Sequence, residues 1–268
     1  MPELDPTIRD YYDRGLEAGR LTGGFPSGPL EFERTKEIIS RYLSAPPRKI
    51  IDIGGGPGLY SAWLAERGDD VHLVDPVGLH VNQARSAHSR IKAEIGDARQ
   101  LAHSDAAFDI ALLLGPLYHL VGREDRLLAL SEARRVVHPG GWVFAAAISR
   151  YAALFDLLVR ADLLHDPEIF RLVEHVVETG VFHGQVSQLF TTAYFHLPAE
   201  LAEEVSAAGF ELKALLNIEG PGFLLHDFEA RWADPVKRKT VLDAARLVEA
   251  KPELLSASSH ILAVAQKR

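Results

Sequence analysis

Short apolar segments recur along the chain and are separated by stretches with the spacing of helices. Those after Arg48 span residues 49–54, 71–75, 91–96, 108–114 and 142–148. Strands with such continuous apolar character are buried on both faces, which is typical of parallel sheets. The alternation therefore predicts strand–helix–strand units in an α/β protein, with a mostly parallel sheet and helices on both faces.

Helices are predicted before the first strand and before the fifth. Apolar residues recur at helical spacing over 125–137, and the sequence His-Pro-Gly-Gly at 138–141 then ends that crossover helix. An earlier helix starts near Pro29, where helices favour proline, and ends before Pro46. Together with the segment before it, this helix predicts an N-terminal helical cap over residues 1–47.

The regular alternation of strands and helices is interrupted after the fifth strand. Residues 149–197 are too long for a simple connection and contain two predicted helices, near 151–164 and 167–179. Long insertions at this position often carry function, so we expect a helical lid over a substrate site. The alternative, that the insertion only covers core surface, stays open.

The tail returns to the alternation of helix and strand. It predicts a helix at 198–208, a strand at 210–218, a helix at 228–250 and a last strand at 260–266. With the five earlier segments this makes seven strands. A single domain over residues 1–268, with the cap and lid attached, is the simplest organisation.

Composition narrows the class of protein. The 268 residues are 47% hydrophobic and 25% charged, and no apolar run is long enough to span a bilayer. The N-terminus lacks the basic start and apolar centre of an export signal, so we expect a cytoplasmic protein without a membrane partner. A net charge of -8 argues against a nucleic-acid partner, because binding to phosphates depends on lysine and arginine. No cysteine is present, and the twelve histidines show no paired ligand spacing, so no metal site is predicted.

A glycine cluster follows the first predicted strand. The sequence Asp-Ile-Gly-Gly-Gly-Pro-Gly at 52–58 lies between that strand and a predicted helix, where glycine lets the backbone approach a ligand closely. Asp75 ends the next strand and can accept hydrogen bonds from ribose hydroxyls. The spacing is G-x-G-x-G instead of the G-x-G-x-x-G of dinucleotide sites, which favours another nucleoside ligand.

From this cluster onward the sequence resembles the class I S-adenosylmethionine-dependent methyltransferases, and more narrowly the bacterial small-molecule type. The likeness covers residues 48–148. Within this range it includes Gly-Asp-Ala at 96–98, the segment 109–120 and Arg-Arg-Val-Val-His-Pro-Gly-Gly-Trp-Val-Phe at 134–144. It implies a Rossmann-like, seven-stranded sheet whose last strand is antiparallel, with S-adenosylmethionine as cofactor.

The resemblance also implies roles for particular residues. Glycines of the turn line the methionine part of the cofactor, Asp75 holds the ribose, and Asp97 with Ala98 meets the adenine. Pro76 and Leu101 can offer apolar contact to the adenine, while Asp97 has a simpler alternative as a turn or helix cap. The expected cofactor-binding residues are Gly54, Gly55, Gly56, Gly58, Asp75, Pro76, Asp97, Ala98, Leu114, Gly115, Tyr11 and Arg20. The last two, and Tyr12, are candidates for closing over the cofactor from the cap.

The fourth strand ends in Gly-Pro-Leu-Tyr-His at 115–119, beside the expected methyl group. Methyltransferases that act on amino groups of bases or glutamine carry Asn/Asp-Pro-Pro-Tyr or a close variant here. The polar first residue is missing, which argues against such acceptors. Tyr118 and His119 are the catalytic candidates. For His119, three roles stay open: a general base, a substrate contact, or a structural histidine.

Candidate substrate contacts come from the insertion and its borders. In an extended segment Tyr194 and His196 point to the same side, so they either line an acceptor pocket or pack the lid. Arg150 can pair with an acidic acceptor, although a lone arginine is usually a solvated surface group. Glu219, in a turn after the sixth strand, is a further candidate.

These observations favour methyl transfer to an oxygen or nitrogen of a small-molecule metabolite, by a monomer or homodimer. An NAD(P)-dependent oxidoreductase is the less favoured enzyme, because the glycine spacing differs and no Tyr-x-x-x-Lys pair is present. A non-catalytic S-adenosylmethionine-binding protein remains a second alternative, since it would keep the same cofactor residues.

Overall fold

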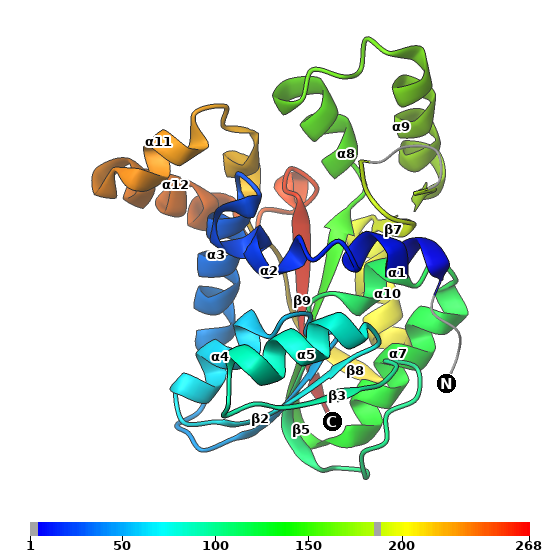
Figure 1. Ribbon diagram of the computed structural model, residues 1–268, viewed down its shortest axis with the longest axis vertical. Helices are drawn as coiled ribbons and strands as arrows, with labels where there is room; N and C mark the ends of the chain where they lie inside the picture. The colour runs from blue at the N-terminus through cyan, green and yellow to red at the C-terminus, as the bar shows by residue number, and fades with distance from the viewer. Residues whose placement is uncertain (1–4, 185–188) are drawn as a thin grey trace.

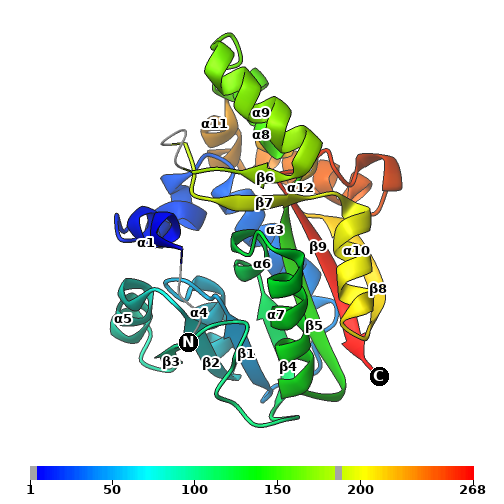
Figure 2. The ribbon, with the colours of Figure 1, turned by 90° about the vertical axis from the view of Figure 1, so that its right-hand side faces the viewer.

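A twisted sheet forms the centre of the molecule, and helices lie against its two faces (Figures 1 and 2). The computed structural model describes residues 5–184 and 189–268. Within these residues the sheet has nine strands. They are β1 (Lys49–Ile53), β2 (Asp70–Asp75), β3 (Lys92–Ile95), β4 (Phe108–Leu113), β5 (Val137–Ser149), β6 (Val181–Phe182), β7 (Ala193–His196), β8 (Phe210–Asn217) and β9 (His260–Lys267).

The strand order confirms the predicted parallel sheet with an antiparallel last strand. Strands β3, β2, β1, β4 and β5 are adjacent and parallel. Strand β9 runs antiparallel between β5 and β8. The seven predicted strands are all present, but the count of seven is too low. Two further strands, β6 and β7, form a short hairpin inside the insertion, and β7 pairs with only the last two residues of β5. Pairings this short leave little alternation in the sequence for a prediction to use.

Helices cover both faces of the sheet and its carboxyl edge. The α-helices are α1 (Pro6–Tyr12), α2 (Glu17–Gly19), α3 (Gly28–Ser40), α4 (Leu59–Glu66), α5 (Gly78–Ala87), α6 (Pro116–His119), α7 (Arg123–Val136), α8 (Ala152–Phe155), α9 (Pro167–Thr179), α10 (Pro198–Ala207), α11 (Phe228–Ala233) and α12 (Pro235–Val248). The helical turns of π or 3-10 type are η1 (Arg20–Gly24), η2 (Asp156–Arg160), η3 (Gly220–Leu224) and η4 (Pro252–Leu254).

Two apolar layers hold the sheet between its helices. Ile110 and Leu112 of β4 face the side covered by α3, α4 and α5. Ala111 and Leu113 face the side covered by α7 and α10. Each large aliphatic side chain buried in this way contributes about 1.5–3 kcal/mol relative to exposure. Burial on both faces explains why the strands read as continuous apolar runs in the sequence.

Two predicted helices differ from those in the structure. The helix expected over 228–250 is two helices, because the Asp234 side chain accepts from the amide of Val236 at 2.9 Å and Pro235 begins a new helix. The helix expected over 151–164 is α8 followed by the π-helical turn η2.

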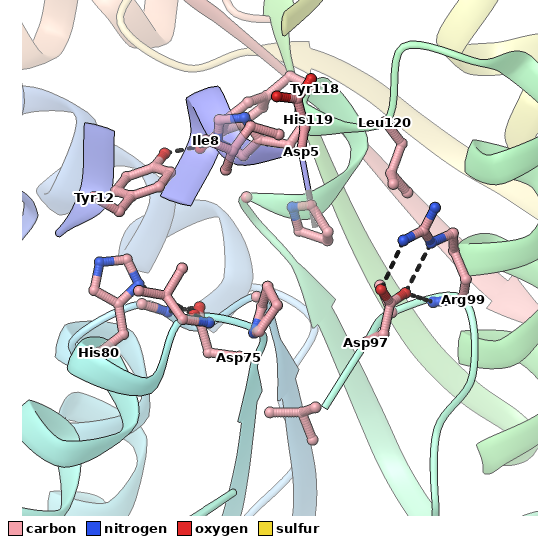
Figure 3. Close-up of a pocket in the computed structure, with 18 of the residues that line it drawn as sticks. Asp5, Ile8, Tyr12, Asp75, His80, Asp97, Arg99, Tyr118, His119 and Leu120 are labelled. Atoms are coloured by element: carbon pink, nitrogen blue, oxygen red, sulfur yellow. Dashed lines mark hydrogen bonds and ion pairs between the residues drawn. The ribbon is translucent and has the colours of Figure 1, made fainter. Parts of the chain in front are cut away.

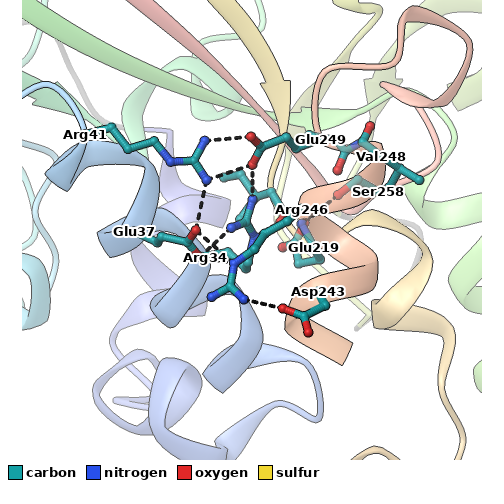
Figure 4. A network of polar contacts seen from close by, with 11 residues as sticks. Arg34, Glu37, Arg41, Glu219, Asp243, Arg246, Val248, Glu249 and Ser258 are labelled. Atoms are coloured by element: carbon teal, nitrogen blue, oxygen red, sulfur yellow. Dashed lines mark hydrogen bonds and ion pairs between the residues drawn. The ribbon is translucent and has the colours of Figure 1, made fainter. Parts of the chain in front are cut away.

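An ion-pair network joins α3 to α12 (Figure 4). The fully buried guanidinium of Arg34 pairs with Glu37 and with Glu249, and it also donates to the carbonyl of Ile218 at 3.3 Å. Arg246 of α12 donates to Glu37 at 2.9 Å. Removing one partner of a buried pair costs roughly 3–5 kcal/mol. The network therefore fixes the segment that follows β8. This segment leads to the functional site.

The insertion rises above the carboxyl ends of the parallel strands, with α8 and α9 as its outermost part (Figure 1). Residues 1–4 of the predicted cap and 185–188 of the predicted lid lie outside the described residues. The roles of residues 1–47 as a cap and of residues 149–197 as a lid remain predictions. In the part of the chain that the structure describes, no helix has the length and apolar character that crossing a membrane requires.

Candidate active site

The turn after β1 is shaped by glycines. Gly54 and Gly56 have φ of 70° and 57°, in the left-handed region that other residues rarely adopt. A Cβ atom on Gly54 would lie 2.9 Å from Cδ of Pro116, so only glycine lets α6 approach this closely. The turn and the start of α6 are therefore packed against each other at the carboxyl edge of the sheet.

A first cavity of about 280 Å³ lies between the ends of β1 to β4 and helix α1 (Figure 3). Its lining residues include Gly54, Gly56, Asp75, Pro76, Asp97, Ala98, Arg99, Gly115, Tyr118 and His119. The Asp75 carboxylate accepts from the amides of Gly56 at 2.8 Å and Val77 at 2.9 Å. The carboxylates of Asp75 and Asp97 stand on opposite sides of the cavity (Figure 3), and Asp97 pairs with Arg99 at 2.8 Å.

A second, smaller cavity of about 60 Å³ is also lined by the glycine turn. Its lining includes Asp52, Gly55, Leu114 and Arg20. The carboxylate of Asp52 accepts from the Ser61 hydroxyl at 2.7 Å, and burial raises the pKa of Asp52 to about 6. In this cavity an acidic group therefore lies beside the glycine turn, where the backbone can approach a ligand most closely.

A third cavity of about 280 Å³ lies under the insertion. Its walls are mainly apolar and aromatic, and they come from the cap, α8, η2 and the β6–β7 hairpin. They are formed by Tyr11, Tyr12, Phe25, Ile148, Ala152, Ala153, Leu157, Phe182, Leu189, Phe190 and Phe195. Polar groups, namely Glu17, Arg20, Tyr118, Asp156, Ser259 and His260, complete its lining. Tyr118 and Glu17 line all three cavities, so the three meet at these side chains.

His119 contacts the cap directly. Its Nε2 atom and the Tyr12 hydroxyl lie 2.6 Å apart, which joins α1 to α6 over the first cavity. Burial lowers the pKa of His119 to about 4, so the imidazole is neutral at pH 7. It lines the first cavity and not the third, and Nε2 is engaged by Tyr12. This geometry favours a positioning role, and the role of general base stays a prediction.

Three possible metal ligands, Glu31, Glu219 and His260, have donor atoms within 4.8 Å of one another. Their charges are already compensated by protein groups. Arg20 donates to both carboxylate oxygens of Glu31, at 2.6 and 3.0 Å, and His260 bonds to Glu219 at 2.6 Å. The cluster is an ion-pair network and not an open coordination site.

Comparison with known proteins identifies the family. The model of a methyltransferase domain matches residues 50–141. An uncharacterized methyltransferase of Mycobacterium tuberculosis is 33% identical over 129 residues, which are 48% of this chain and 51% of that protein, so the chain spans about half the length of the first relatives it matches. A ubiquinone biosynthesis O-methyltransferase of Azorhizobium caulinodans is 31% identical over 212 residues, covering 75% of this chain and 76% of that protein. The chain belongs to the class I S-adenosylmethionine-dependent methyltransferases. In fold, it resembles the structure of a possible histamine N-methyltransferase of Thermotoga maritima, with a TM-score of 0.61, 17% identity, and coverage of 98% and 99%.

S-adenosylmethionine is the cofactor of this family of methyltransferases, and the residues at the edge of the sheet fit it. A Cβ atom on Gly56 would meet only Cγ of Glu17, at 3.9 Å, so the turn leaves room for a ligand against its backbone. The first two cavities offer carboxylates, which suit ribose hydroxyls, the adenine amine and the ammonium group of the methionine part.

Most of the residues expected to bind the cofactor lie together. The first cavity contains Gly54, Gly56, Asp75, Pro76, Asp97, Ala98 and Gly115, and the second contains Gly55, Leu114 and Arg20. Tyr11 lines the third cavity only. Gly58 lies outside the three cavities, where a Cβ atom would be 3.1 Å from Ala84. This glycine therefore serves the packing of α4 against α5. Leu101 is buried in the core below the sheet edge.

None of the four expected substrate contacts, Glu219 included, lines the three cavities. Arg150 is buried and pairs with Glu200 at 2.8 Å, so it is neither a substrate contact nor a solvated surface group. Tyr194 and His196 do share one side of β7, with ring centroids 4.7 Å apart, but that side faces Glu204 and Arg126. The opposite side carries Phe195, which lines the third cavity.

Sequence reasoning missed Glu17, Arg99 and His260. Glu17 lies in α2, a helix of three residues with no periodic pattern. Arg99 could have been found from the sequence, because it lies two residues after Asp97 and can pair with it locally. His260 begins β9, and the fact that an antiparallel strand starts at the ligand edge is the signal that could have found it.

Proposed function

We propose that this chain transfers a methyl group from S-adenosylmethionine to an oxygen or nitrogen of a small-molecule acceptor in the third cavity. The observation that carries the proposal is the position of Tyr118. Its side chain lines the two cavities that suit the cofactor and also the apolar cavity under the insertion. An acceptor in the third cavity would therefore meet the cofactor at Tyr118.

The first two cavities supply the groups that would hold the cofactor. Asp75 would hold the ribose and Asp97 the adenine amine, while Asp52 would accept from the ammonium group of the methionine part. When bound, the cofactor supplies an electrophilic methyl group on sulfur. The chain's own contribution is to hold the acceptor in line with that group and to exclude water.

Tyr118 is suited to orient the acceptor as a hydrogen-bond donor. Its hydroxyl lies 3.6 Å from the position of a Cβ atom on Gly115, over the turn that would contact the cofactor. Burial raises the pKa of Tyr118, so its hydroxyl keeps its proton at neutral pH. The name of the Azorhizobium relative, an O-methyltransferase, supports oxygen as the acceptor atom.

Transfer of radiolabelled methyl groups from S-adenosylmethionine into a metabolite extract tests the proposal. Wild type should label a small molecule, and Gly56→Arg, which fills the first cavity, should label none. Gly140→Arg is the matched control, because Gly140 also has positive φ (83°) but a Cβ atom there meets nothing within 4 Å. Cofactor binding by calorimetry without any labelled product would instead indicate a non-catalytic binding protein.

A further inference from the structure

A histidine and a glutamate form a hydrogen-bonded pair beside the third cavity. His260 is the first residue of β9, and Glu219 follows the end of β8. The Nδ1 atom of His260 lies 2.6 Å from Oε1 of Glu219. The carboxylate can only accept, so Nδ1 donates to it, and in the neutral form of the ring the free lone pair is on Nε2.

Glu219 is itself held firmly. It is 1% exposed, and its Oε2 atom accepts from the Ser258 hydroxyl at 2.7 Å and from the backbone amide of His260 at 3.0 Å. Glu219 and Ser258 lie beside the network that joins α3 to α12 (Figure 4). The ring orientation of His260 is therefore fixed from below by groups that do not line the cavity.

The other side of the ring is open. His260 lines the third cavity, and among the described residues its Nε2 atom has no hydrogen-bond partner and is not a buried, unsatisfied atom. Tyr118 also lines this cavity and joins it to the two cofactor cavities. An acceptor in the cavity can thus present a hydroxyl to Nε2.

Charged groups around the ring favour its protonated form. Burial alone would lower the pKa of His260, but the carboxylates of Glu31 from α3 and Glu219 outweigh it and raise the pKa, while Arg20 from η1 acts in the opposite direction. Glu31 Oε2 lies 3.8 Å from Nδ1. A proton taken up at Nε2 is therefore stabilised by two carboxylates.

We propose that His260, oriented by Glu219, is the general base that takes the proton from the acceptor's hydroxyl group. This inference rests on the proposed methyl transfer. The hydroxyl proton goes to Nε2 of His260, and the oxygen forms its bond to the methyl carbon. The carbon–sulfur bond breaks with its electrons on sulfur, which leaves as the neutral thioether S-adenosylhomocysteine. The imidazolium then gives its proton to water. His260 is a catalytic residue in this step, and Glu219 is a positioning residue.

The surroundings of the pair also indicate the class of acceptor. A carboxylic acid is ionised at neutral pH and needs no base, so the pair would serve no purpose for such an acceptor. The walls are aromatic and apolar, which suits a flat, uncharged ring. The acceptor is therefore a hydroxyl group on an aromatic ring.

Methylation of a phenol series tests this assignment, with 4-nitrophenol as the most acidic member and 4-methylphenol as the least. His260→Asn keeps a donor toward Glu219 but has no basic nitrogen. It should lower kcat about 100-fold for 4-methylphenol, in the range of general-base catalysis, and much less for 4-nitrophenol, which ionises without help. Glu219→Gln should lower the apparent pKa in the pH profile of kcat/KM. The affinity of His260→Asn for S-adenosylhomocysteine, measured by calorimetry, should equal that of wild type.

His138→Asn is the matched control, because His138 forms a histidine–aspartate pair with Asp109, at 2.9 Å, at the opposite end of β5. It should leave every rate unchanged. Equal losses for all phenols in His260→Asn, or no loss, would overturn the base assignment while leaving methyl transfer intact. If wild type methylates other metabolites and none of the phenols, the acceptor class is wrong. If wild type methylates nothing, the proposed function fails with it.

Discussion

The carboxyl group of Asp52 should make the protein less stable as the pH rises, and Asp52→Asn should remove this effect. Asp52 is 1% exposed, and burial raises its pKa from the ordinary value of 3.8 to about 6. The folded state therefore holds this proton more strongly than the unfolded state. Its contribution is most favourable below about pH 4 and is lost as the pH rises through 6.

The size of the effect follows from the shift. A difference of about two pKa units, at about 1.4 kcal/mol each, corresponds to about 3 kcal/mol. Asparagine is nearly the same shape and can still accept from the Ser61 hydroxyl. The stability of Asp52→Asn relative to wild type should therefore increase by about 3 kcal/mol between pH 4 and pH 8.

Urea unfolding followed by circular dichroism, at about pH 4, 6 and 8, measures this change. The quantity to compare is the difference in unfolding free energy between Asp52→Asn and wild type. The titration of His119 acts in the opposite direction, but it is the same in both proteins and cancels in this difference. The lowered pKa of His119 means that stability is lost as the pH falls from about 6.5 to 4. Asp70→Asn is the matched control: Lys92 lowers the pKa of Asp70, so this variant should not gain stability with pH. A constant difference between Asp52→Asn and wild type at all three pH values would refute the reasoning.

Three further predictions concern the cavities. Gly54→Ala and Gly140→Ala should each cost about 1–2 kcal/mol of stability, because each places a side chain at positive φ. Only Gly54→Ala should weaken S-adenosylhomocysteine binding in calorimetry, because its Cβ atom would lie 2.9 Å from the ring of Pro116. Equal affinities of the two variants would contradict this. Phe195→Ala should raise the KM of the acceptor, whereas Tyr194→Ala, on the other side of β7, should reduce stability and leave KM unchanged; the same KM for both would count against the third cavity as the acceptor site. Tyr118→Phe should lower kcat about tenfold, as expected for one lost hydrogen bond, without a new pH dependence between pH 6 and 9; an unchanged kcat would remove Tyr118 from the reaction.

The sheet and the cofactor region were predictable because their determinants are local. Each of the strands β1 to β5 is an apolar run that ends in residues with a clear chemical character, such as the glycine turn after Ile53 or Asp75 at the end of β2. Since parallel strands end at one edge, the sequence alone indicates that these groups meet there. The break at Asp234 and Pro235 was equally local, and attention to a proline at the first helical position would have found it.

The acceptor region could not be predicted in the same way. Its walls come from residues 11–25, Tyr118, residues 148–157, Phe182, residues 189–195 and residues 259–260, and no local pattern indicates that these meet. The alternation argument for β7 was right about which residues share a side, but it could not tell which side faces the cavity. That depends on Arg126 and Glu204, which lie on other helices and draw Tyr194 and His196 toward them.

The two histidine candidates illustrate how topology changes the search for a catalytic residue. His119 drew attention because it follows a parallel strand, whose carboxyl end is the usual place for a ligand. Strand β9 runs the other way, so its first residue, His260, lies at the same edge and pairs with Ile148 at the end of β5. Strand β8 runs with β5, and its end delivers Glu219 there as well. In a mixed sheet, functional side chains are therefore expected at the starts of antiparallel strands as much as at the ends of parallel ones. The two positions can be compared directly, because His119→Asn should weaken the contact with the cap at Tyr12, whereas His260→Asn should change the dependence of the rate on acceptor acidity.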